Sequence, residues 1–430
     1  MRLWPKGCLR VEIRGSGQFV GVRGLRWPAC GLAVLLALLC AGCSSGSAAP
    51  QHVALDAGPA AAAFDTPVDI TISGLPPGGA VTVQAQTRDA QGRRWDSQAQ
   101  FRATAAGTLN LATAVPVSGS YHVADANGLL WSLHPAYTTN PAATYTAEPP
   151  GFTVTVQVLT GGHVEATATL RREVTPPASV QTVRQDGFAS ALFAPPQARP
   201  GAPAIVVLGG AEGGEQTELA DGLAVAGYPA LAVGYFKEPG LPQCLCRISL
   251  GYFARAVGWL RAQPVARGRP VVLIGDSAGA EAVLLIASYE PHLADAIVAN
   301  SPSYLITGPP GIPAWTFDGR PLTTGALIPA AGIRIPVLLS DGGQDLVWPS
   351  APSATQIVQE LRRSADPAPY ANLYYPAAGH TTAGLPPDIP MPTILYGAPR
   401  GGSEQADALA AEQFWPSMIK FLNNPAAPLK

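Results

Sequence analysis

The chain has 430 residues, of which 47% are hydrophobic and only 13% charged, so it is long enough for two or three domains with at least one large buried core. Its 27 basic residues nearly balance its 29 acidic residues, and the body of the chain contains no run of lysine or arginine. This excludes the electrostatic footprint of a nucleic-acid-binding protein, and we expect no nucleic-acid partner. The 46 glycines and 44 prolines separate periodic segments, which indicates many turns rather than disorder.

The first 43 residues are typical of an export signal. Basic residues dominate positions 1–30, and the apolar run over 31–39 is too short for an ordinary membrane span. The residues Leu39-Cys-Ala-Gly-Cys43 resemble a bacterial lipoprotein cleavage box, in which the cysteine after the small residues is lipidated and begins the mature protein. We therefore expect residues 1–43 to be a signal peptide and Cys43 to anchor an exported lipoprotein on the outer side of the bacterial cytoplasmic membrane. The alternative is an N-terminal anchor that is not cleaved.

A tether and a β-rich region follow. Residues 44–59 are polar and rich in Ala, Gly and Ser, which predicts a flexible tether. Over residues 60–175, short alternating apolar runs follow one another at spacings of about ten residues with turn residues between them, as in an all-β immunoglobulin-like sandwich. The expected strands are Val68–Ile72, Val81–Ala85, Phe101–Ala103, Tyr121–Val123, Leu129–Trp131, Phe152–Leu159 and His163–Leu170.

The pattern changes again after residue 175. Two short strands, at 180–185 and 189–193, precede a series in which apolar strands alternate with amphipathic helices. This alternation predicts a doubly wound, mostly parallel sheet over residues 176–430. Two proline-rich stretches, 301–331 and 384–402, interrupt the alternation and are long enough to cover a site. The expected strands are 204–208, 230–236, 271–274, 296–299, 337–340 and 372–375, and the expected helices include 250–261, 280–288, 353–362 and 404–422.

The cysteines are unevenly distributed along the chain. Four of the six lie within the first 43 residues, so the folded part holds only Cys244 and Cys246 and is not a disulfide scaffold. These two residues could pair in an oxidising compartment or be two small buried thiols, and the sequence leaves both open. No cofactor and no metal is expected.

The chemistry is predicted to centre on Gly275-Asp-Ser277-Ala-Gly279. The motif follows an aliphatic strand and precedes a helix, which is the strand, turn and helix that a nucleophile elbow requires. Glycines on both sides let the backbone turn tightly and expose the serine Oγ above the sheet. The alternative is an ordinary turn in which Ser277 caps the helix.

A nucleophilic serine needs a base and an acid that orients the base. Of the six histidines, only His380 follows a plausible acid, and it lies just past the last expected strand. The loop after residues 337–340 offers Asp341 and Asp345. We favour Asp345, because the glycines before it let the chain turn before it presents its carboxylate. Ser277, Asp345 and His380 then have the chain order of an α/β-hydrolase triad.

The same fold predicts the oxyanion hole. One donor is expected to be the backbone N–H of Ala278, and the other to come from the glycine-rich loop after residues 204–208, at Ala211 or Glu212. The glycines of that loop are also compatible with a plain tight turn.

Further stretches carry a family resemblance. Over residues 65–425 the chain is similar to the type I acyl-CoA thioesterases and the bile acid-CoA:amino acid N-acyltransferases. The resemblance implies a β-sandwich before an α/β-hydrolase domain. It also implies the thioesterase side of the family, because the amidating members use cysteine as nucleophile and this chain has Ser277. The matching stretches are Ile72–Gly78, Gly128–Leu133, Leu208–Gly214, Tyr235–Phe236, Gly240–Pro242, Ile248–Phe253 and Ala378–His380.

One departure from the family concerns the neighbours of the nucleophile. Family members usually have an aliphatic residue before the nucleophile and a lysine after it, whereas this chain has Asp276 and Ala278. Gly-Asp-Ser-Ala-Gly is also common in carboxylesterases and lipases. The mechanism is therefore more firmly predicted than the substrate class.

Three functional hypotheses follow from the sequence. The first is a serine hydrolase that transfers the acyl group of a fatty acyl-CoA-like thioester to water through an acyl-enzyme on Ser277. Because an exported lipoprotein would not normally meet acyl-CoA, the second is an envelope carboxylesterase, lipase or acyltransferase acting on lipid or other exported esters. In that hypothesis Trp315 and Phe317 line the acyl pocket. The third, a non-catalytic binding protein, is disfavoured by the complete set of triad residues.

Overall fold

The structure is a computed structural model, and the expected signal peptide and Cys43 lie outside the residues that it describes. No helix within those residues combines the length and the hydropathy that crossing a bilayer requires. The described residues are 52–63, 66–139, 143, 145, 151–173, 179–185, 188–364, 369–380, 394–395 and 398–427.

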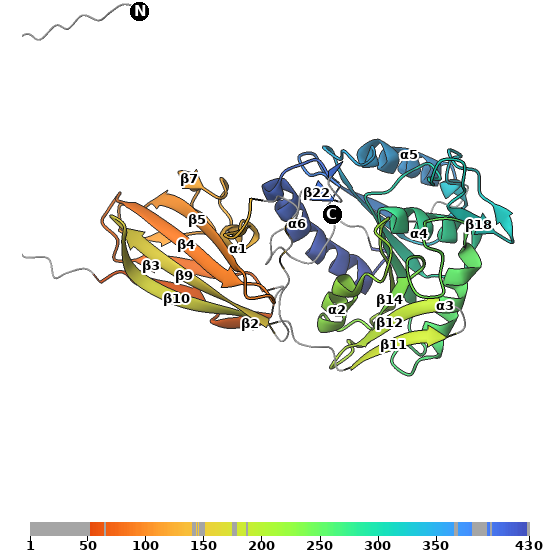
Figure 1. Ribbon diagram of the computed structural model, residues 1–430, viewed down its shortest axis with the longest axis horizontal. Coiled ribbons are helices and arrows are strands. Elements are labelled where there is room, and N and C mark those ends of the chain that lie inside the picture. The colour runs from red at the N-terminus through yellow and green to blue at the C-terminus, as the bar shows by residue number, and fades with distance from the viewer. Residues whose placement is uncertain are drawn as a thin grey trace, which may run out of the picture. The chain divides into compact units, whose positions relative to one another are not determined.

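Strands between residues 54 and 173 form two sheets around one apolar core (Figure 1). One sheet has the order β1-β3-β6, and the other has the order β2-β10-β9-β4-β5-β7 with β8 paired to β5. In β4, Val81, Val83 and Ala85 are buried and the residues between them are not, which is the alternation that predicted these strands. The strands are β1 (Ala54–Gly58), β2 (Ala61–Ala63), β3 (Asp69–Ser73), β4 (Ala80–Arg88), β5 (Arg94–Arg102), β6 (Leu109–Asn110), β7 (Ser118–Gly119), β8 (His134–Pro135), β9 (Gly151–Thr160) and β10 (His163–Glu173).

The start of this domain differs from the expectation. Residues 54–58, expected to belong to the flexible tether, form β1 and pair with β3 along their whole length. The tether prediction is wrong for these residues, because the backbone hydrogen bonds to a partner strand do not depend on the small side chains that suggested a tether.

A second difference lies at Leu129–Trp131, which forms part of the short helix α1 (Gly128–Trp131) rather than a strand. Asp125 fixes the turn that begins α1, since its two oxygens accept the Asn127 N–H at 2.8 Å and the Trp131 Nε1–H at 2.7 Å. All four residues of α1 are buried. An unbroken apolar run of this length does not distinguish a helix from a strand, which explains the wrong prediction. Tyr121–Val123 is likewise outside any strand.

The rest of the chain forms an eight-stranded sheet of order β11-β12-β14-β13-β16-β17-β20-β21. The two pairs at the β11 edge are antiparallel and the other five are parallel. This sheet topology confirms the predicted α/β-hydrolase fold, which follows the all-β domain in the chain. The strands are β11 (Ser179–Gln185), β12 (Phe188–Ala194), β13 (Ala204–Leu208), β14 (Ala230–Gly234), β16 (Val271–Asp276), β17 (Ala296–Asn300), β20 (Val337–Gly342) and β21 (Tyr370–Tyr375).

Helices cover both faces of this sheet, so its strands are apolar on both sides. In β13, Val206 belongs to the core under α3 and α4, whereas Ile205 and Val207 belong to the core under α2 and α6. The helices are α2 (Thr217–Val225), α3 (Leu250–Ala262), α4 (Ala278–Tyr289), α5 (Ser350–Arg362) and α6 (Glu404–Asn423).

The long connections carry small elements of their own. Residues 301–331 contain β18 (Trp315–Phe317), which pairs with β15 (Ile248–Ser249), and β19 (Arg320–Pro321). A hairpin of β22 (Ile394–Leu395) and β23 (Ala398–Pro399) precedes α6. Between β14 and β15, the structure joins Cys244 and Cys246 in a disulfide, which is one of the two arrangements that the sequence left open.

Helix α6 links the two domains. The side chain of Ala408 belongs to the core of the β-sandwich, although α6 otherwise packs on the parallel sheet. Asn127 Nδ2 donates to Glu412 Oε1 at 2.9 Å, and the His122 N–H donates to Gln405 Oε1 at 3.0 Å. The C-terminal helix is therefore part of the packing of both domains.

Candidate active site

Ser277 occupies the sharp turn between β16 and α4. Its backbone has φ 57° and ψ −115°, a conformation that a residue with a side chain rarely adopts. The flanking glycines are sterically required. A Cβ on Gly275 would lie 2.1 Å from the carbonyl oxygen of Gly279, and a Cβ on Gly279 would lie 2.3 Å from that of Leu208. The local structure is that of a nucleophile elbow, as the spacing of the two glycines predicts.

The structure brings the three predicted triad residues into one hydrogen-bonded chain. The distance from Ser277 Oγ to His380 Nε2 is 2.9 Å, and the distance from His380 Nδ1 to Asp345 Oδ2 is 2.8 Å. The Ser277 residue is 8% exposed and the His380 side chain 4%, so both are largely shielded from water. This arrangement can transfer the serine proton to an imidazole whose second nitrogen is held by a carboxylate.

Asp345 is itself held from the other side. Its Oδ1 accepts the backbone N–H groups of Val347 at 2.9 Å and Trp348 at 3.2 Å, which leaves Oδ2 for His380. The ring of Trp348 stands edge-on to the imidazole at 5.3 Å. Asp341, the alternative acid, lies within β20 and makes no hydrogen bond to His380. Burial raises the pKa of the Asp341 carboxyl to about 6.

The expected oxyanion donors lie beside the serine. Ala278 is the first residue of α4, so its N–H precedes the helical hydrogen bonds and has no acceptor within the helix. The glycine-rich loop passes close by, since a Cβ on Gly210 would lie 3.2 Å from Ser277 Cβ. Within the loop, Glu212 Oε1 accepts the Gly210 N–H at 2.9 Å. The side chain of Glu212 therefore braces the loop, and its backbone and that of Ala211 are the groups available as donors.

Asp276, one of the two residues that depart from the pattern of the resembled family, adds a carboxyl group next to Ser277. Part of its surface reaches solvent, but protein surrounds the carboxyl group closely. This desolvation raises its pKa to about 6, a shift that the charge of His380 opposes and that of Glu212 increases.

The predicted pocket residues Trp315 and Phe317 have different surroundings from those expected. Trp315 is completely buried in the core with Tyr235, and its Nε1 donates to Glu281 Oε1 at 2.6 Å. Phe317 packs on Tyr289, with ring centroids 4.9 Å apart. The structure thus gives Trp315 a core position, because its indole N–H finds a buried acceptor that sequence spacing does not reveal.

Glu281 is a buried residue of α4 that the sequence reasoning missed. Besides Trp315, it accepts the Thr307 N–H at 2.8 Å and the Thr307 hydroxyl at 2.5 Å. Burial raises the pKa of Glu281 to about 7. An acid inside an otherwise apolar helix, Ala278–Ile286, was the available signal, since such a residue requires buried partners.

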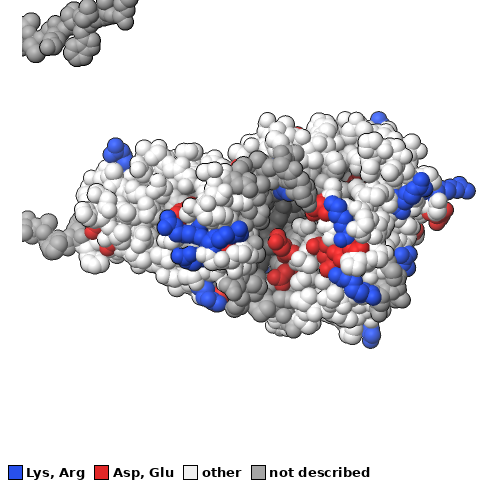
Figure 2. All heavy atoms as spheres, viewed as in Figure 1, with Lys and Arg blue, Asp and Glu red and all other residues white. Residues whose placement is uncertain are grey.

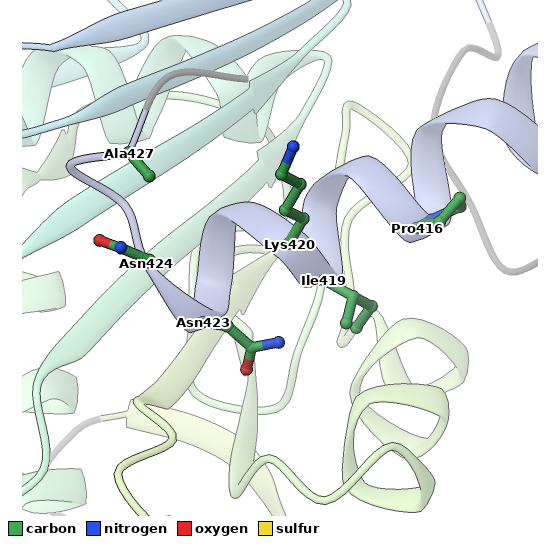
Figure 3. A pocket seen from close by; sticks show the side chains of 6 residues that line it. All are labelled: Pro416, Ile419, Lys420, Asn423, Asn424 and Ala427. Atoms are coloured by element: carbon green, nitrogen blue, oxygen red, sulfur yellow. The ribbon is translucent and has the colours of Figure 1, made fainter. Parts of the chain in front are cut away.

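A pocket of about 440 Å³ at the C-terminal end of α6 is a separate feature (Figure 3). None of the three triad residues lines it, so it is not part of the candidate active site. Its lining residues are Pro416, Ile419, Lys420, Asn423, Asn424 and Ala427.

Two family models match the chain. Residues 65–185 match the acyl-CoA thioester hydrolase/BAAT N-terminal region, and residues 248–310 and 318–427 match the BAAT/acyl-CoA thioester hydrolase C-terminal region. The chain belongs to the acyl-CoA thioester hydrolase/BAAT family. The resemblance stated from the sequence motifs is thereby confirmed.

Individual members of the acyl-CoA thioester hydrolase/BAAT family are similar over most of the chain. The mitochondrial acyl-coenzyme A thioesterase 2 of Mus musculus is 29% identical over 396 residues, covering 84% of this chain and 86% of that protein. Acyl-coenzyme A thioesterase 1 of Homo sapiens is 28% identical over 398 residues, covering 84% of this chain and 93% of that protein. Among solved structures, an alpha/beta hydrolase enzyme from a deep-sea metagenome library matches 58% of this chain and 98% of its own, with 14% identity and a TM-score of 0.39.

Proposed function

We propose that this protein is a serine hydrolase that cleaves acyl thioesters through an acyl-enzyme on Ser277. The observation that carries the proposal is the chain of hydrogen bonds from Ser277 through His380 to Asp345, on a strained elbow, in a member of the acyl-CoA thioester hydrolase/BAAT family. The catalytic roles of the three residues are part of this proposal.

The proposed reaction has two halves. His380 Nε2 takes the proton of Ser277 as Oγ attacks the acyl carbon, and the imidazolium returns a proton to the departing thiolate. Asp345 stabilises the imidazolium through Nδ1–H. Water then attacks the acyl-enzyme, with His380 again as base. The bond between the acyl carbon and Ser277 Oγ breaks, the imidazolium returns its proton to Oγ, and the free acid leaves. In both halves the N–H groups of Ala278 and of the loop at Ala211 or Glu212 stabilise the negative oxygen of the tetrahedral intermediate.

The favoured acyl donor is a thioester of coenzyme A, as in the relatives named acyl-coenzyme A thioesterases. The second candidate is hydrolysis or transfer of oxygen esters in the cell envelope. Asp276 favours that candidate, because a carboxyl group next to the nucleophile, when ionised, opposes an anionic leaving group such as coenzyme A.

One experiment, on protein that begins at Ser44, distinguishes the two candidate functions. Release of free thiol from palmitoyl-CoA and release of p-nitrophenol from p-nitrophenyl esters are followed in parallel. We expect thiol release by the unmodified protein and none by Ser277→Ala, with Ser288→Ala on the same helix as the control. Activity on oxygen esters alone would contradict the thioesterase proposal in favour of the second candidate.

We also propose that residues 1–42 are removed and that Cys43, which then begins the mature protein, carries a lipid that anchors the protein to the outer side of the bacterial cytoplasmic membrane. The motif at residues 39–43 supports this proposal. Cys43→Ser should abolish incorporation of labelled palmitate and release the protein from the membrane fraction, whereas the matched variant Cys40→Ser should remain anchored. A Cys43→Ser protein that still partitions wholly into membranes would contradict lipidation.

A further inference from the structure

A segment near the C-terminus holds the acid loop and the histidine loop at a defined separation. The carbonyl oxygen of Arg400 accepts two backbone hydrogen bonds, one from the His380 N–H at 3.0 Å and one from the Leu346 N–H at 3.1 Å. Leu346 directly follows Asp345 in the chain. The Arg400 carbonyl oxygen therefore bonds the backbone both at His380 and directly after Asp345. The separation of the His380 and Asp345 loops thus depends on a residue that belongs to neither loop.

Asp407, in the first turn of α6, makes a further hydrogen bond to the loop that carries His380. Its residue is completely buried, and its Oδ1 accepts the N–H of Gly379 at 2.7 Å. Gly379 immediately precedes His380. The fit around this bond is tight, because a Cβ on Gly402 would lie 2.3 Å from the Gly379 nitrogen and 2.7 Å from Asp407 Oδ1. The hydrogen bond is thus built into the packing of the turn that presents the histidine.

The second oxygen of Asp407 is not used by the fold. In the part of the chain that the structure describes, Oδ2 is buried and has no hydrogen-bond partner. Burial raises the pKa of Asp407 to about 7. The charged groups that act on Asp407 are Arg400, Asp345 and His380, and Asp407 in turn acts on Glu404 of the same helix. A carboxylate with an unused oxygen remains an electrostatic neighbour of the histidine.

We propose that Asp407 is a positioning residue of the catalytic histidine. Its carboxylate fixes the turn at Gly379 and His380 through the backbone hydrogen bond. When the group is ionised, above about pH 7, its negative charge adds to that of Asp345 in stabilising the imidazolium that forms when Ser277 is deprotonated. This inference rests on the catalytic triad proposed above.

The test uses two substitutions that separate the hydrogen bond from the charge. Asp407→Asn keeps an oxygen for the Gly379 N–H and removes the charge, whereas Asp407→Ala removes both. The rate at which a fluorophosphonate labels Ser277 is measured from pH 5 to pH 9, because this rate reports the activation of the serine and requires no acyl substrate. Thermal unfolding of each variant is measured alongside.

For Asp407→Asn, we expect labelling to be slower by about three- to tenfold at pH 8, where Asp407 is ionised, and the acid limb of the profile to change, because the ionisation of Asp407 near pH 7 no longer contributes to it. For Asp407→Ala, we expect a loss of about a hundredfold, since the turn is no longer held. The control is Asp221→Asn, which changes a carboxyl group on α2 that also has a buried oxygen without a hydrogen-bond partner among the described residues. It should leave the acid limb unchanged.

The outcomes are distinguishable. If the unmodified protein is not labelled, or if Ser277→Ala is labelled equally well, the proposed triad is wrong. If Ser277 is labelled and both Asp407 variants retain the rate and the acid limb of the unmodified protein, Asp407 has no positioning role. If Asp407→Ala only lowers the unfolding temperature and Asp407→Asn leaves the profile unchanged, the contribution of Asp407 is structural and the proposal is overturned.

Discussion

At the scale of single residues, the candidate site depends on which aspartate meets the histidine. Asp341 and Asp345 are four residues apart, and both lie at the end of β20 or just beyond it. Only Asp345 reaches His380 Nδ1, because the chain turns through Gly342 and Gly343 before presenting it. That turn needs glycine, since a Cβ on Gly342 would lie 1.9 Å from the Gly379 carbonyl oxygen.

The two aspartates should therefore respond differently to the same substitution. Asp345→Asn should lower kcat about a thousandfold or more, because an amide cannot orient and stabilise the imidazolium as a carboxylate does. Asp341→Asn is the matched control and should stay within about threefold of the unmodified protein. Steady-state kinetics on a substrate that the unmodified protein hydrolyses would measure kcat for both variants. A larger loss for Asp341→Asn would mean that Asp341 is the working acid.

At the scale of elements, the connection over residues 301–331 is attached to both halves of the site. Glu281 on α4 accepts three hydrogen bonds from this connection, two from Thr307 and one from Trp315. At its start, Ser301 Oγ donates to the His380 carbonyl oxygen at 2.7 Å. The connection thus fixes α4, which begins directly after Ser277, relative to the loop that carries His380.

Substitutions of Glu281 test this attachment. Glu281→Ala should lower the free energy of unfolding by about 2–4 kcal/mol, because it leaves the Trp315 and Thr307 donors unsatisfied in the core and creates a cavity. Glu281→Gln should cost less than about 1 kcal/mol, since its oxygen can accept from the same two N–H groups and its amide can donate to the Thr307 hydroxyl. Urea unfolding measures both, with Glu218→Ala on α2 as an exposed control. Equal losses for Ala and Gln would contradict the hydrogen-bonding account.

At the scale of the whole molecule, buried acids are a recurring feature. Among the residues that the structure describes, burial raises the pKa of six carboxyl groups to between about 6 and about 8, although the molecule also exposes acidic and basic groups on its surface (Figure 2). The folded protein therefore retains protons that the unfolded chain releases at lower pH. The six groups are Asp276, Glu281, Asp341, Glu404, Asp407 and Glu412.

This feature predicts how stability depends on pH. A raised carboxyl pKa contributes stability that is fully present below the pKa of the unfolded chain, about 4, and is lost as pH rises through the pKa of the folded protein. The unfolding temperature should therefore fall between pH 5 and pH 8 at constant ionic strength. Asp341→Asn, which removes one such group, should show a smaller fall. An unfolding temperature that rises over this range would contradict the assignment of these raised pKa values.

Much of the fold follows from local patterns in the sequence. Period-two alternation predicts strands such as β4 and β9, and continuous apolar runs followed by helices predict the parallel sheet, because burial on one or both faces dictates these patterns. The same rules mislead at α1, where every residue is buried, and at β1, whose small side chains carry no pattern. The secondary structure of such segments depends on strand pairing with, and burial against, residues that are distant in sequence.

The residues of the candidate site also fall into two groups: those that the sequence predicts and those that only the structure reveals. Ser277 and His380 could be found from the sequence alone, because a nucleophile elbow imposes its glycines locally and the fold imposes the order of serine, acid and histidine along the chain. The places of Asp407 and Trp315 depend on residues brought together from distant parts of the chain. The sequence by itself thus determined the type of fold and the residues of the candidate triad. Only the tertiary structure decided which buried side chains hold those residues in place, since a hydrogen bond between distant loops leaves no periodic trace in the chain.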